Sequence, residues 1–202
     1  MRAYQKVEGI AALLLRDDID TDQILPSAYL RRFDADYSVG LFAGWRKDPG
    51  FVLTNPAYRS AKILIAGANF ACGSTREHAV WALASFGFRV LIAKSFAEIF
   101  RANCLKNALL PIVLEAEAHV ALVEAARLAA ATGRFTVDLV NTRITGPDGF
   151  GLSFQIAQNE RTALLEGLDE ISMTLLAEDA IAAYEARQRT ERPWLQTLRK
   201  PT

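Results

Sequence analysis

A short segment in the first half of the chain gathers side chains that could do chemistry. Cys72, Ser74 and Arg76 bring a thiol, a hydroxyl and a guanidinium together, and Glu77 and His78 follow at once. The residues after them are almost all apolar, so the expected helix is buried and its polar groups are confined to its first turn. Because the N-terminus of a helix disfavours a cation, Arg76 at this place indicates a site that grips a carboxylate or a phosphate.

The same residues also have plain structural interpretations. Ser74 and Glu77 have the spacing of a capping box, in which two side chains satisfy free backbone N–H groups at the start of a helix. His78 is explained by a structural hydrogen bond and Cys72 by inert burial, although a place before a helix N-terminus favours a reactive thiolate. Cys104 is expected to pack in the core. Local pattern leaves both capping and chemistry open for Ser74, and it leaves Arg76 open as an ordinary surface residue.

Motifs that bind metals or nucleotides by themselves do not fit. The acidic run over residues 18–22 begins like a calcium loop, but Gln23 and Tyr29 stand where glycine and glutamate are needed. Residues 67–73 lack the lysine of a phosphate-binding loop, and Arg76 replaces the second glycine of a hydrolase nucleophile elbow. Two cysteines and two histidines are too few for a disulfide scaffold, a three-histidine zinc site or, from this chain alone, an iron–sulfur cluster held by three or four cysteines.

The elements that must position this segment are those of an α/β fold. Aliphatic runs predict buried strands, and polar or alanine-rich segments between them predict helices. Strand and helix alternate at the spacing of βαβ units, which indicates a parallel sheet whose ligands bind at the carboxyl ends of its strands. The strands are expected over residues 10–15, 62–66, 89–93 and 111–114, and the helices over residues 74–86 and 95–107.

The remainder of the chain is expected to add a helix, a small group of strands and further helices. These are expected over residues 115–132 for the first helix, 135–140, 143–145 and 152–156 for the strands, and 157–165 and 178–189 for the later helices. Residues 29–58 are rich in turn signals, and a long irregular stretch of this kind is often functional. We interpret residues 1–202 as a single α/β domain with a C-terminal helical extension and a loosely ordered tail over residues 190–202.

Composition narrows the classes of function. The chain of 202 residues is 51% hydrophobic, and its 23 Lys and Arg residues balance 23 Asp and Glu residues. With these charges in balance, the chain has no net positive charge of the kind that indicates binding to nucleic acid or to an anionic membrane. No apolar stretch approaches the ~18 residues of a membrane span, and the first twenty residues lack a signal-peptide pattern. We expect a soluble, cytoplasmic protein.

The segment closely resembles a motif of one enzyme family. Residues 69–79, preceded by the Asp-Thr-Asp-Gln-Ile-Leu-Pro stretch at 20–26, are similar to the small subunit of 3-isopropylmalate dehydratase, which corresponds to the swivel domain of aconitase. The similarity continues through residues 94–100, Asn103 and residues 109–112, 167–171 and 179–185, so it spans almost the whole chain. It implies the swivelling β/β/α fold of the aconitase C-terminal domain.

The resemblance also implies a reaction and a partner. Members of this family act in a hydro-lyase that isomerises 2-isopropylmalate to 3-isopropylmalate by dehydration and rehydration, a step of leucine biosynthesis. It implies a heterodimer in which a [4Fe–4S] cluster is held by a separate large subunit, and the open iron of that cluster acts as a Lewis acid on the small diacid substrate. No metal or cofactor is expected on this chain, which is expected to be active only with that partner.

Roles for individual residues follow from the same resemblance. Carried over by position, Ser74 is the base that removes a proton from a substrate carbon, and Arg76 binds a substrate carboxylate. Thr21 and Asp22, which help to shape the site from the first loop, are expected to bind substrate too. So is Arg31, which lies in the loop that senses the variable side group of the substrate. A serine alkoxide needs stabilisation, for which the amides of the helix N-terminus and Arg76 are the available means.

Two departures from the family pattern stand out. Ala71 replaces a common glycine, and Arg31 and Arg32 are odd beside an isopropyl group because an unpaired cation next to an apolar group is costly. A paralogue acting on homoaconitate or on citraconate is therefore an alternative. Outside this class, the residues also permit a hydrolase that uses Cys72 or Ser74 with His78, or a carboxylate-binding module without chemistry.

Overall fold

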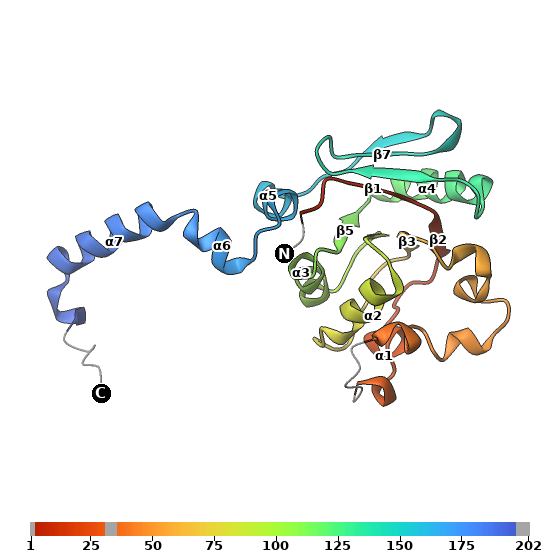
Figure 1. The fold of residues 1–202 in the computed structure, drawn as a ribbon, viewed down its shortest axis with the longest axis horizontal. Coiled ribbons are helices and arrows are strands. Elements are labelled where there is room, and N and C mark those ends of the chain that lie inside the picture. Colours follow the sequence, from red (N-terminus) through yellow and green to blue (C-terminus); the bar gives the residue numbers. More distant parts are fainter. Residues whose placement is uncertain (1–2, 31–35, 197–202) are drawn as a thin grey trace.

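The computed structural model describes residues 3–30 and 36–196. In this part of the chain the backbone forms seven α-helices and two four-stranded sheets (Figure 1). One sheet is parallel with the strand order β2-β3-β4-β5, and the other is antiparallel with the order β1-β6-β7-β8. None of the described helices is long and apolar enough to cross a membrane.

The parallel sheet confirms the predicted βαβ units. Its four strands lie within one residue of the predicted bounds, and successive strands along the chain are neighbours in the sheet. The elements of this part are β2 (Ala11–Leu14), β3 (Ile63–Ala66), α2 (His78–Phe86), β4 (Val90–Ala93), α3 (Glu98–Lys106), β5 (Leu110–Val113) and α4 (Ala116–Ala129).

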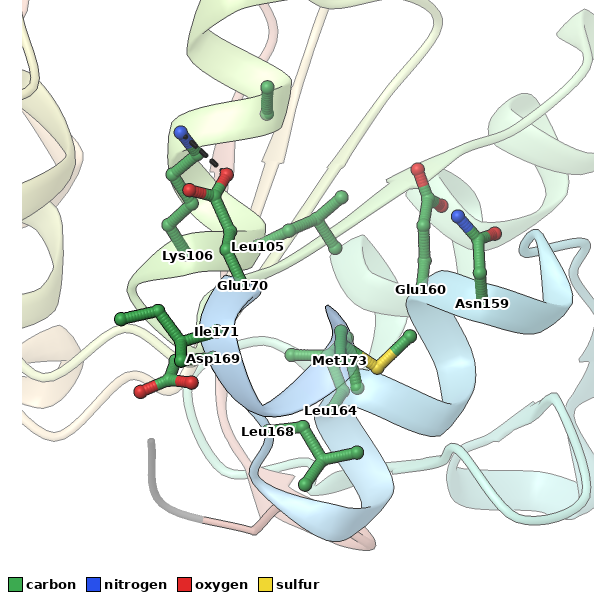
Figure 2. Close-up of a pocket in the computed structure, with 12 residues that line it drawn as sticks. Leu105, Lys106, Asn159, Glu160, Leu164, Leu168, Asp169, Glu170, Ile171 and Met173 are labelled. Atoms are coloured by element: carbon green, nitrogen blue, oxygen red, sulfur yellow. Dashed lines mark ion pairs between the residues drawn. The ribbon is translucent and has the colours of Figure 1, made fainter. Parts of the chain in front are cut away.

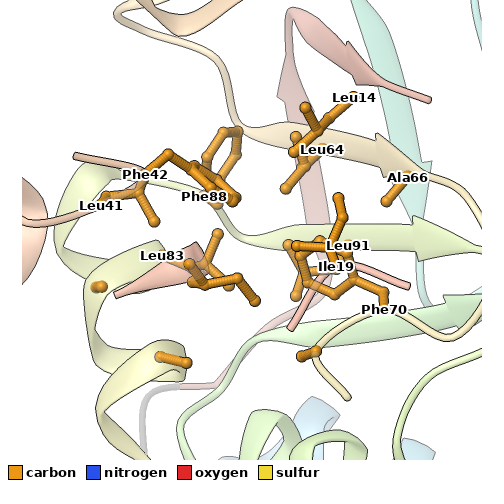
Figure 3. Close-up of a cluster of buried hydrophobic side chains, with 14 of the residues drawn as sticks. Leu14, Ile19, Leu41, Phe42, Leu64, Ala66, Phe70, Leu83, Phe88 and Leu91 are labelled. Carbon is orange, nitrogen blue, oxygen red and sulfur yellow. The ribbon is translucent and has the colours of Figure 1, made fainter. Parts of the chain in front are cut away.

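Both faces of this sheet are covered, which explains why its strands are continuous aliphatic runs. Leu64 and Ala66 of β3 face a core formed with α2, α3 and the irregular chain between β2 and β3 (Figure 3). Ile63 and Ile65 of the same strand face the opposite core, which α4 and the antiparallel sheet complete. Side chains that alternate along one strand thus enter two different cores, and a polar residue at any of these positions would be buried.

The antiparallel sheet confirms the three strands predicted in the second half of the chain and adds one. In β6, buried Phe135 and Val137 alternate with partly exposed neighbours, as expected of a strand with one covered face. The added strand, β1, is short and mostly exposed, so its sequence carries no such signal. The elements are β1 (Lys6–Gly9), β6 (Phe135–Asp138), β7 (Arg143–Thr145), the 3₁₀ turn η6 (Pro147–Gly149) and β8 (Gly151–Ser153).

The irregular stretch between β2 and β3 packs as part of the core. Leu41 and Phe42 are fully buried, and the ring of Phe42 stacks on that of Trp45 with 5.3 Å between centroids. Arg31 lies outside the described residues. The short helices of this stretch are α1 (Thr21–Ile24), η1 (Ser27–Tyr29), η2 (Tyr37–Val39), η3 (Trp45–Lys47), η4 (Val52–Thr54) and η5 (Pro56–Tyr58).

The last helices of the described chain extend away from the two sheets and the helices packed on them, which we call the body. Arg101 of α3 makes two hydrogen bonds to Glu160 of α5, at 2.6 and 2.7 Å, and these bonds raise the pKa of Arg101. Beyond α5, the helices α6 and α7 bury no residue and run away from the sheets (Figure 1). Residues 190–196 of the predicted tail form the end of α7 and η7, and residues 197–202 lie outside the described residues. The elements are α5 (Gln158–Glu166), α6 (Glu170–Leu175), α7 (Glu178–Glu191) and η7 (Pro193–Gln196).

Candidate active site

Two loops meet where β2 and β3 end. The amide of Ala68 donates to Asp17 Oδ1 at 2.6 Å, and the amide of Asp18 donates to the Ala68 carbonyl at 3.0 Å. Gly67 makes this approach possible, because a Cβ at that position would lie 2.2 Å from Asp17 Oδ1 and 2.5 Å from the Arg16 carbonyl oxygen. The two loops therefore pack backbone against backbone at the carboxyl edge of the sheet, as the fold class predicts for a ligand site.

The loops stay paired for several more residues. Cys72 donates its amide to the Ile19 carbonyl at 3.2 Å, and Thr21 donates its amide to the Cys72 carbonyl at 3.0 Å. Asp20 then begins α1 with a capping box, in which its carboxylate accepts from the amide of Gln23 at 2.7 Å. This pairing places Thr21, the first residue of α1, beside the segment that contains the chemistry-bearing side chains.

That segment has an unusual backbone. Asn69, Ala71 and Gly73 all have positive φ, at 51°, 61° and 92°. Asn69 tolerates this conformation well, and its side chain donates to Asp18 Oδ1 at 2.8 Å. Ala71 is less suited, because a left-handed conformation costs a residue with a Cβ roughly 1–2 kcal/mol. A glycine at this position would not carry that cost.

Four of the five predicted site residues come together at the end of this segment. The Ser74 amide donates to Thr21 Oγ1 at 3.2 Å. Ser74 Oγ accepts two hydrogen bonds from Arg76, one from its amide at 3.3 Å and one from Nε at 2.9 Å. The guanidinium of Arg76 also donates through Nη2 to Asp22 Oδ1, as an ion pair. The fifth predicted residue, Arg31, lies outside the described residues.

The burial of these groups suits a site that faces solvent. Thr21 is 3% exposed, whereas Ser74 is half-buried and the side chains of Arg76 and Asp22 are 32% and 63% exposed. The buried residue Thr21 thus holds the backbone of Ser74, and Ser74 itself is partly exposed. Two donors aimed at one oxygen favour a negative charge on it, which is the electrostatic requirement for a serine that acts as a base.

The predicted start of α2 is wrong by four residues, and so is the predicted capping box. The helix begins at His78, and Glu77 occupies the N-cap position without capping through its side chain. The Ser74 amide is bonded to Thr21 instead, and the Glu77 carboxylate accepts from Asn107 Nδ2 at 2.6 Å. Arg76 consequently precedes the helix and does not lie in its first turn, and it is Arg76, not the helix amides, that donates to Ser74 Oγ.

Two asparagines of α3 and its C-terminal cap support the segment, a contribution that sequence reasoning missed. Asn107 donates to Glu77 and accepts from Trp81 Nε1 at 3.2 Å, and Asn103 Nδ2 donates to the Thr75 carbonyl at 3.4 Å. The signal available in the sequence was a pair of asparagines four residues apart, which places both on one face of a helix.

The arrangement does not provide the nucleophile and base of a hydrolase. The His78 ring packs against those of Tyr37 and Trp81, with centroids 5.6 and 4.7 Å away, and its buried Nδ1 has no hydrogen-bond partner among the described residues. We predicted a structural hydrogen bond for His78, and within the described residues Nδ1 does not make one. No hydrogen bond within the described ranges joins His78 to Ser74 or Cys72, although such a bond is how a hydrolase activates its nucleophile.

The donor set of the chain does not fit an iron–sulfur cluster. Residues 3–30 and 36–196 contain no group of three or more His, Cys, Asp or Glu side chains that could hold a metal ion. Cys104 is fully buried, as predicted, and burial raises the pKa of its thiol. A cluster ligated by cysteine alone takes three or four thiolates, and the sequence has two cysteines, so this chain by itself does not supply the ligands of such a cluster.

Comparisons with known proteins identify the family of the chain. Residues 1–117 match the family of aconitase C-terminal domains, and residues 170–197 match the family described as the C-terminal domain of the 3-isopropylmalate dehydratase small subunit. The 3-isopropylmalate dehydratase small subunits of Cupriavidus necator and Rhodospirillum centenum are 44% and 47% identical over 204 and 201 residues, which cover 96% of this chain and 98% of each of theirs. That of Frankia casuarinae is 48% identical over 187 residues, 92% of this chain and 95% of its own.

A solved structure extends the similarity to the fold. The crystal structure of 3-isopropylmalate dehydratase from Methanocaldococcus jannaschii aligns with a TM-score of 0.64 and 27% identity, over 89% of this chain and 99% of that one. The predicted aconitase swivel-type fold and the predicted resemblance are thereby confirmed. The chain belongs to the aconitase C-terminal domain family and, within it, to the 3-isopropylmalate dehydratase small subunits.

Proposed function

We propose that this chain is the small subunit of a cytoplasmic 3-isopropylmalate dehydratase, which isomerises 2-isopropylmalate to 3-isopropylmalate for leucine biosynthesis. Its partner in the proposal is a large subunit that carries a [4Fe–4S] cluster. The observation that carries the proposal is the network of Ser74, Arg76, Asp22 and Thr21 at the carboxyl edge of the sheet. The near-full-length similarity to chains named as this small subunit supports it.

Ser74 is the proton-transferring group of the proposal. Its Oγ takes a proton from one substrate carbon during dehydration and returns a proton to the neighbouring carbon during rehydration. The negative charge that Oγ carries as an alkoxide before it accepts the proton lies against the amide and Nε of Arg76, which are already in place. When bound to the partner, the cluster would supply a Lewis acid that eases loss of the substrate hydroxyl.

Arg76 has two tasks in this arrangement. Its Nε remains on Ser74 Oγ, and its Nη2, which now donates to Asp22, is the part that can bind a substrate carboxylate. Thr21 fixes the backbone of Ser74 through a buried hydroxyl. Asp22 therefore holds the guanidinium in position when no diacid is bound.

The substrate assignment is tested by reconstitution. The chain is co-expressed with the large subunit of the same organism, purified without oxygen, and assayed with 2-isopropylmalate, homoaconitate and citraconate by the ultraviolet absorbance of the unsaturated acid. We expect turnover with 2-isopropylmalate only when both chains are present. Preference for another diacid would reassign the substrate, and esterase activity of this chain alone would replace the proposal with the hydrolase.

A further inference from the structure

The last part of the described chain, residues 170–196, has the surface of an interface. We call it the C-terminal arm. Seven of the fourteen exposed large apolar side chains among the described residues lie in it, including Ile171 at 72%, Leu176 at 64% and Tyr184 at 53% exposure. Single exposed apolar residues are ordinary, but such a concentration on one segment marks a binding surface.

The longest helix of the arm, α7, also lacks the packing that normally stabilises helices. The 14 residues of α7 bury none of their side chains, and Tyr184 has its ring contact with Arg187 of the same helix. Isolated helices shorter than ~12–15 residues are marginal in water, because most helical stability comes from tertiary packing. A helix of this length that leaves the body is therefore expected to gain its packing from another molecule (Figure 1).

The base of the arm forms an apolar hollow that continues this surface. A pocket of about 620 Å³ lies between α3, α5 and α6 and is lined by apolar side chains that include Leu105, Leu168 and Met173 (Figure 2). Lys106 of α3 pairs with Glu170 of α6 at 2.9 Å at its rim. The pocket is lined by none of the predicted site residues, so it is distinct from the candidate active site.

The arm is nevertheless connected to that site through α3. Lys106, which pairs with Glu170 of the arm, precedes Asn107, which donates to Glu77 next to the Ser74 segment. Asn103 of the same helix donates to the Thr75 carbonyl. A molecule seated on the arm would thus lie against the helix that supports the reacting residues.

The family comparisons help to identify the molecule that would cover the arm. The arm lies outside the match to the aconitase C-terminal domain and has a family of its own, described as the C-terminal domain of the small subunit. Small subunits from Cupriavidus necator and Rhodospirillum centenum align with this chain over 98% of their length. The arm is thus a feature of chains whose name implies one common partner.

We propose that the C-terminal arm is a docking element for the cluster-bearing large subunit, which covers the apolar side chains of α6 and α7. This inference rests on the proposed function, because that function supplies the partner. The arm lies on this chain, so its contribution to the contact can be measured without turnover.

The two faces of α7 provide a matched pair of variants. Ile181 and Tyr184 are three residues apart and share a face, whereas Ala183 and Ala186 lie on the opposite face. All four are exposed. I181D/Y184D removes the apolar surface and adds two charges, and A183D/A186D adds the same charges without removing it. Neither variant touches a buried residue, so both are expected to unfold at the temperature of the wild-type chain.

The experiment measures the Kd of each full-length chain for the purified large subunit by titration calorimetry. We expect I181D/Y184D to raise the Kd at least 30-fold and A183D/A186D to change it less than threefold. Turnover at saturating I181D/Y184D is expected to return to within threefold of wild type, because the variant leaves the site intact. Unchanged affinity of I181D/Y184D would overturn the inference.

Other outcomes separate this inference from the proposed function. If the wild-type chain binds the large subunit but the complex isomerises none of the diacids, the proposed function fails and the Kd comparison still decides the role of the arm. A wild-type chain that does not bind overturns both. Sedimentation of the free chain tests whether a second copy of this chain covers the arm instead. If the wild-type chain forms a dimer that I181D/Y184D does not form, and the affinity of this variant for the large subunit is unchanged, the inference is overturned in favour of self-association.

Discussion

The candidate active site and the C-terminal arm are organised in opposite ways. In the site, Ser74 bonds to Thr21, 53 residues away, and Gly67 lies against the backbone of Arg16. In the arm, the contacts of α7 are local, such as the pair between Arg189 and Glu185 at 3.5 Å. The difference teaches that the body of the chain preorganises its reacting groups by its own folding, whereas the arm keeps its apolar surface for another molecule.

Ser74→Ala is expected to have the largest effect. It tests whether the preorganised site contains the reacting group. Removing the oxygen that Arg76 surrounds should lower kcat of the complex at least 10³-fold, about 4 kcal/mol in activation free energy. Substrate affinity is expected to stay within a few-fold, since the carboxylate contacts remain. Thr75→Ala, which removes a neighbouring hydroxyl, is the control and should retain turnover within threefold. Turnover of Ser74→Ala within tenfold of wild type would refute its role as base.

A second test compares how much a side chain of the body and a side chain of the arm contribute to the stability of the free chain. The two variants are Leu64→Ala and Ile181→Ala. Leu64 is fully buried in the core of the parallel sheet, so its truncation should cost about 3 kcal/mol of unfolding free energy. Ile181 is 41% exposed on the arm, and its truncation should change that free energy by less than about 0.5 kcal/mol. Urea unfolding of the free chain measures both. A similar loss for the two variants would show that the arm packs on the body.

Arg76→Lys sharpens the assignment inside the site. An ammonium group cannot donate to Ser74 Oγ and to a carboxylate with the fork geometry of a guanidinium. We expect kcat/KM to fall about 10²-fold, with KM raised because the carboxylate contact is lost. Arg59→Lys, outside the site, controls for the change of cation and should leave the kinetics unaltered. Kinetics of Arg76→Lys equal to those of wild type would remove this residue from the site.

Ala71→Gly is expected to have the smallest effect. Glycine removes the conformational cost of the positive φ at this position, which stabilises the folded chain. It also removes a buried methyl group and gives the unfolded chain more freedom, and both changes are destabilising. Because these effects nearly cancel, the free energy of unfolding should change by less than about 0.5 kcal/mol. Ala82→Gly is the comparison, because Ala82 is equally buried but lies within α2. There the same change should cost about 1.5 kcal/mol in thermal unfolding. Equal losses would mean that Ala71 is not strained.

Much of the fold could be predicted because the parallel sheet is buried on both faces. That burial produces the unbroken aliphatic runs of β2 and β3. A short run of this kind could also belong to a helix, but the alternation with helical segments at the spacing of βαβ units favours strands. The strand β1 and the helix α6 were missed for the converse reason, since α6 is six residues long with no buried side chain and β1 is mostly exposed. Elements that bury little leave little pattern in the sequence.

The site was predictable only in part. The spacing of Ser74 and Glu77 matches a capping box, but the partners that overrule it, Thr21 and Asn107, lie far along the chain and leave no local signal. The real capping box, Asp20 with Gln23, has the same kind of spacing and was available to the same reasoning. The convergence of Thr21 with Ser74 followed from the family resemblance, because loop pairing over fifty residues cannot be read from spacing.

The ion pair between Asp22 and Arg76 has a consequence for how tightly a diacid is held. In the proposed mechanism an arriving substrate would exchange one carboxylate for another, because the guanidinium already has an anionic neighbour, and it would gain only the difference between the two interactions. Asp22 is largely in water, so the displaced group is readily rehydrated. Such an exchange favours moderate affinity and rapid release, which suits an enzyme whose substrate and product are isomers that bind through the same groups.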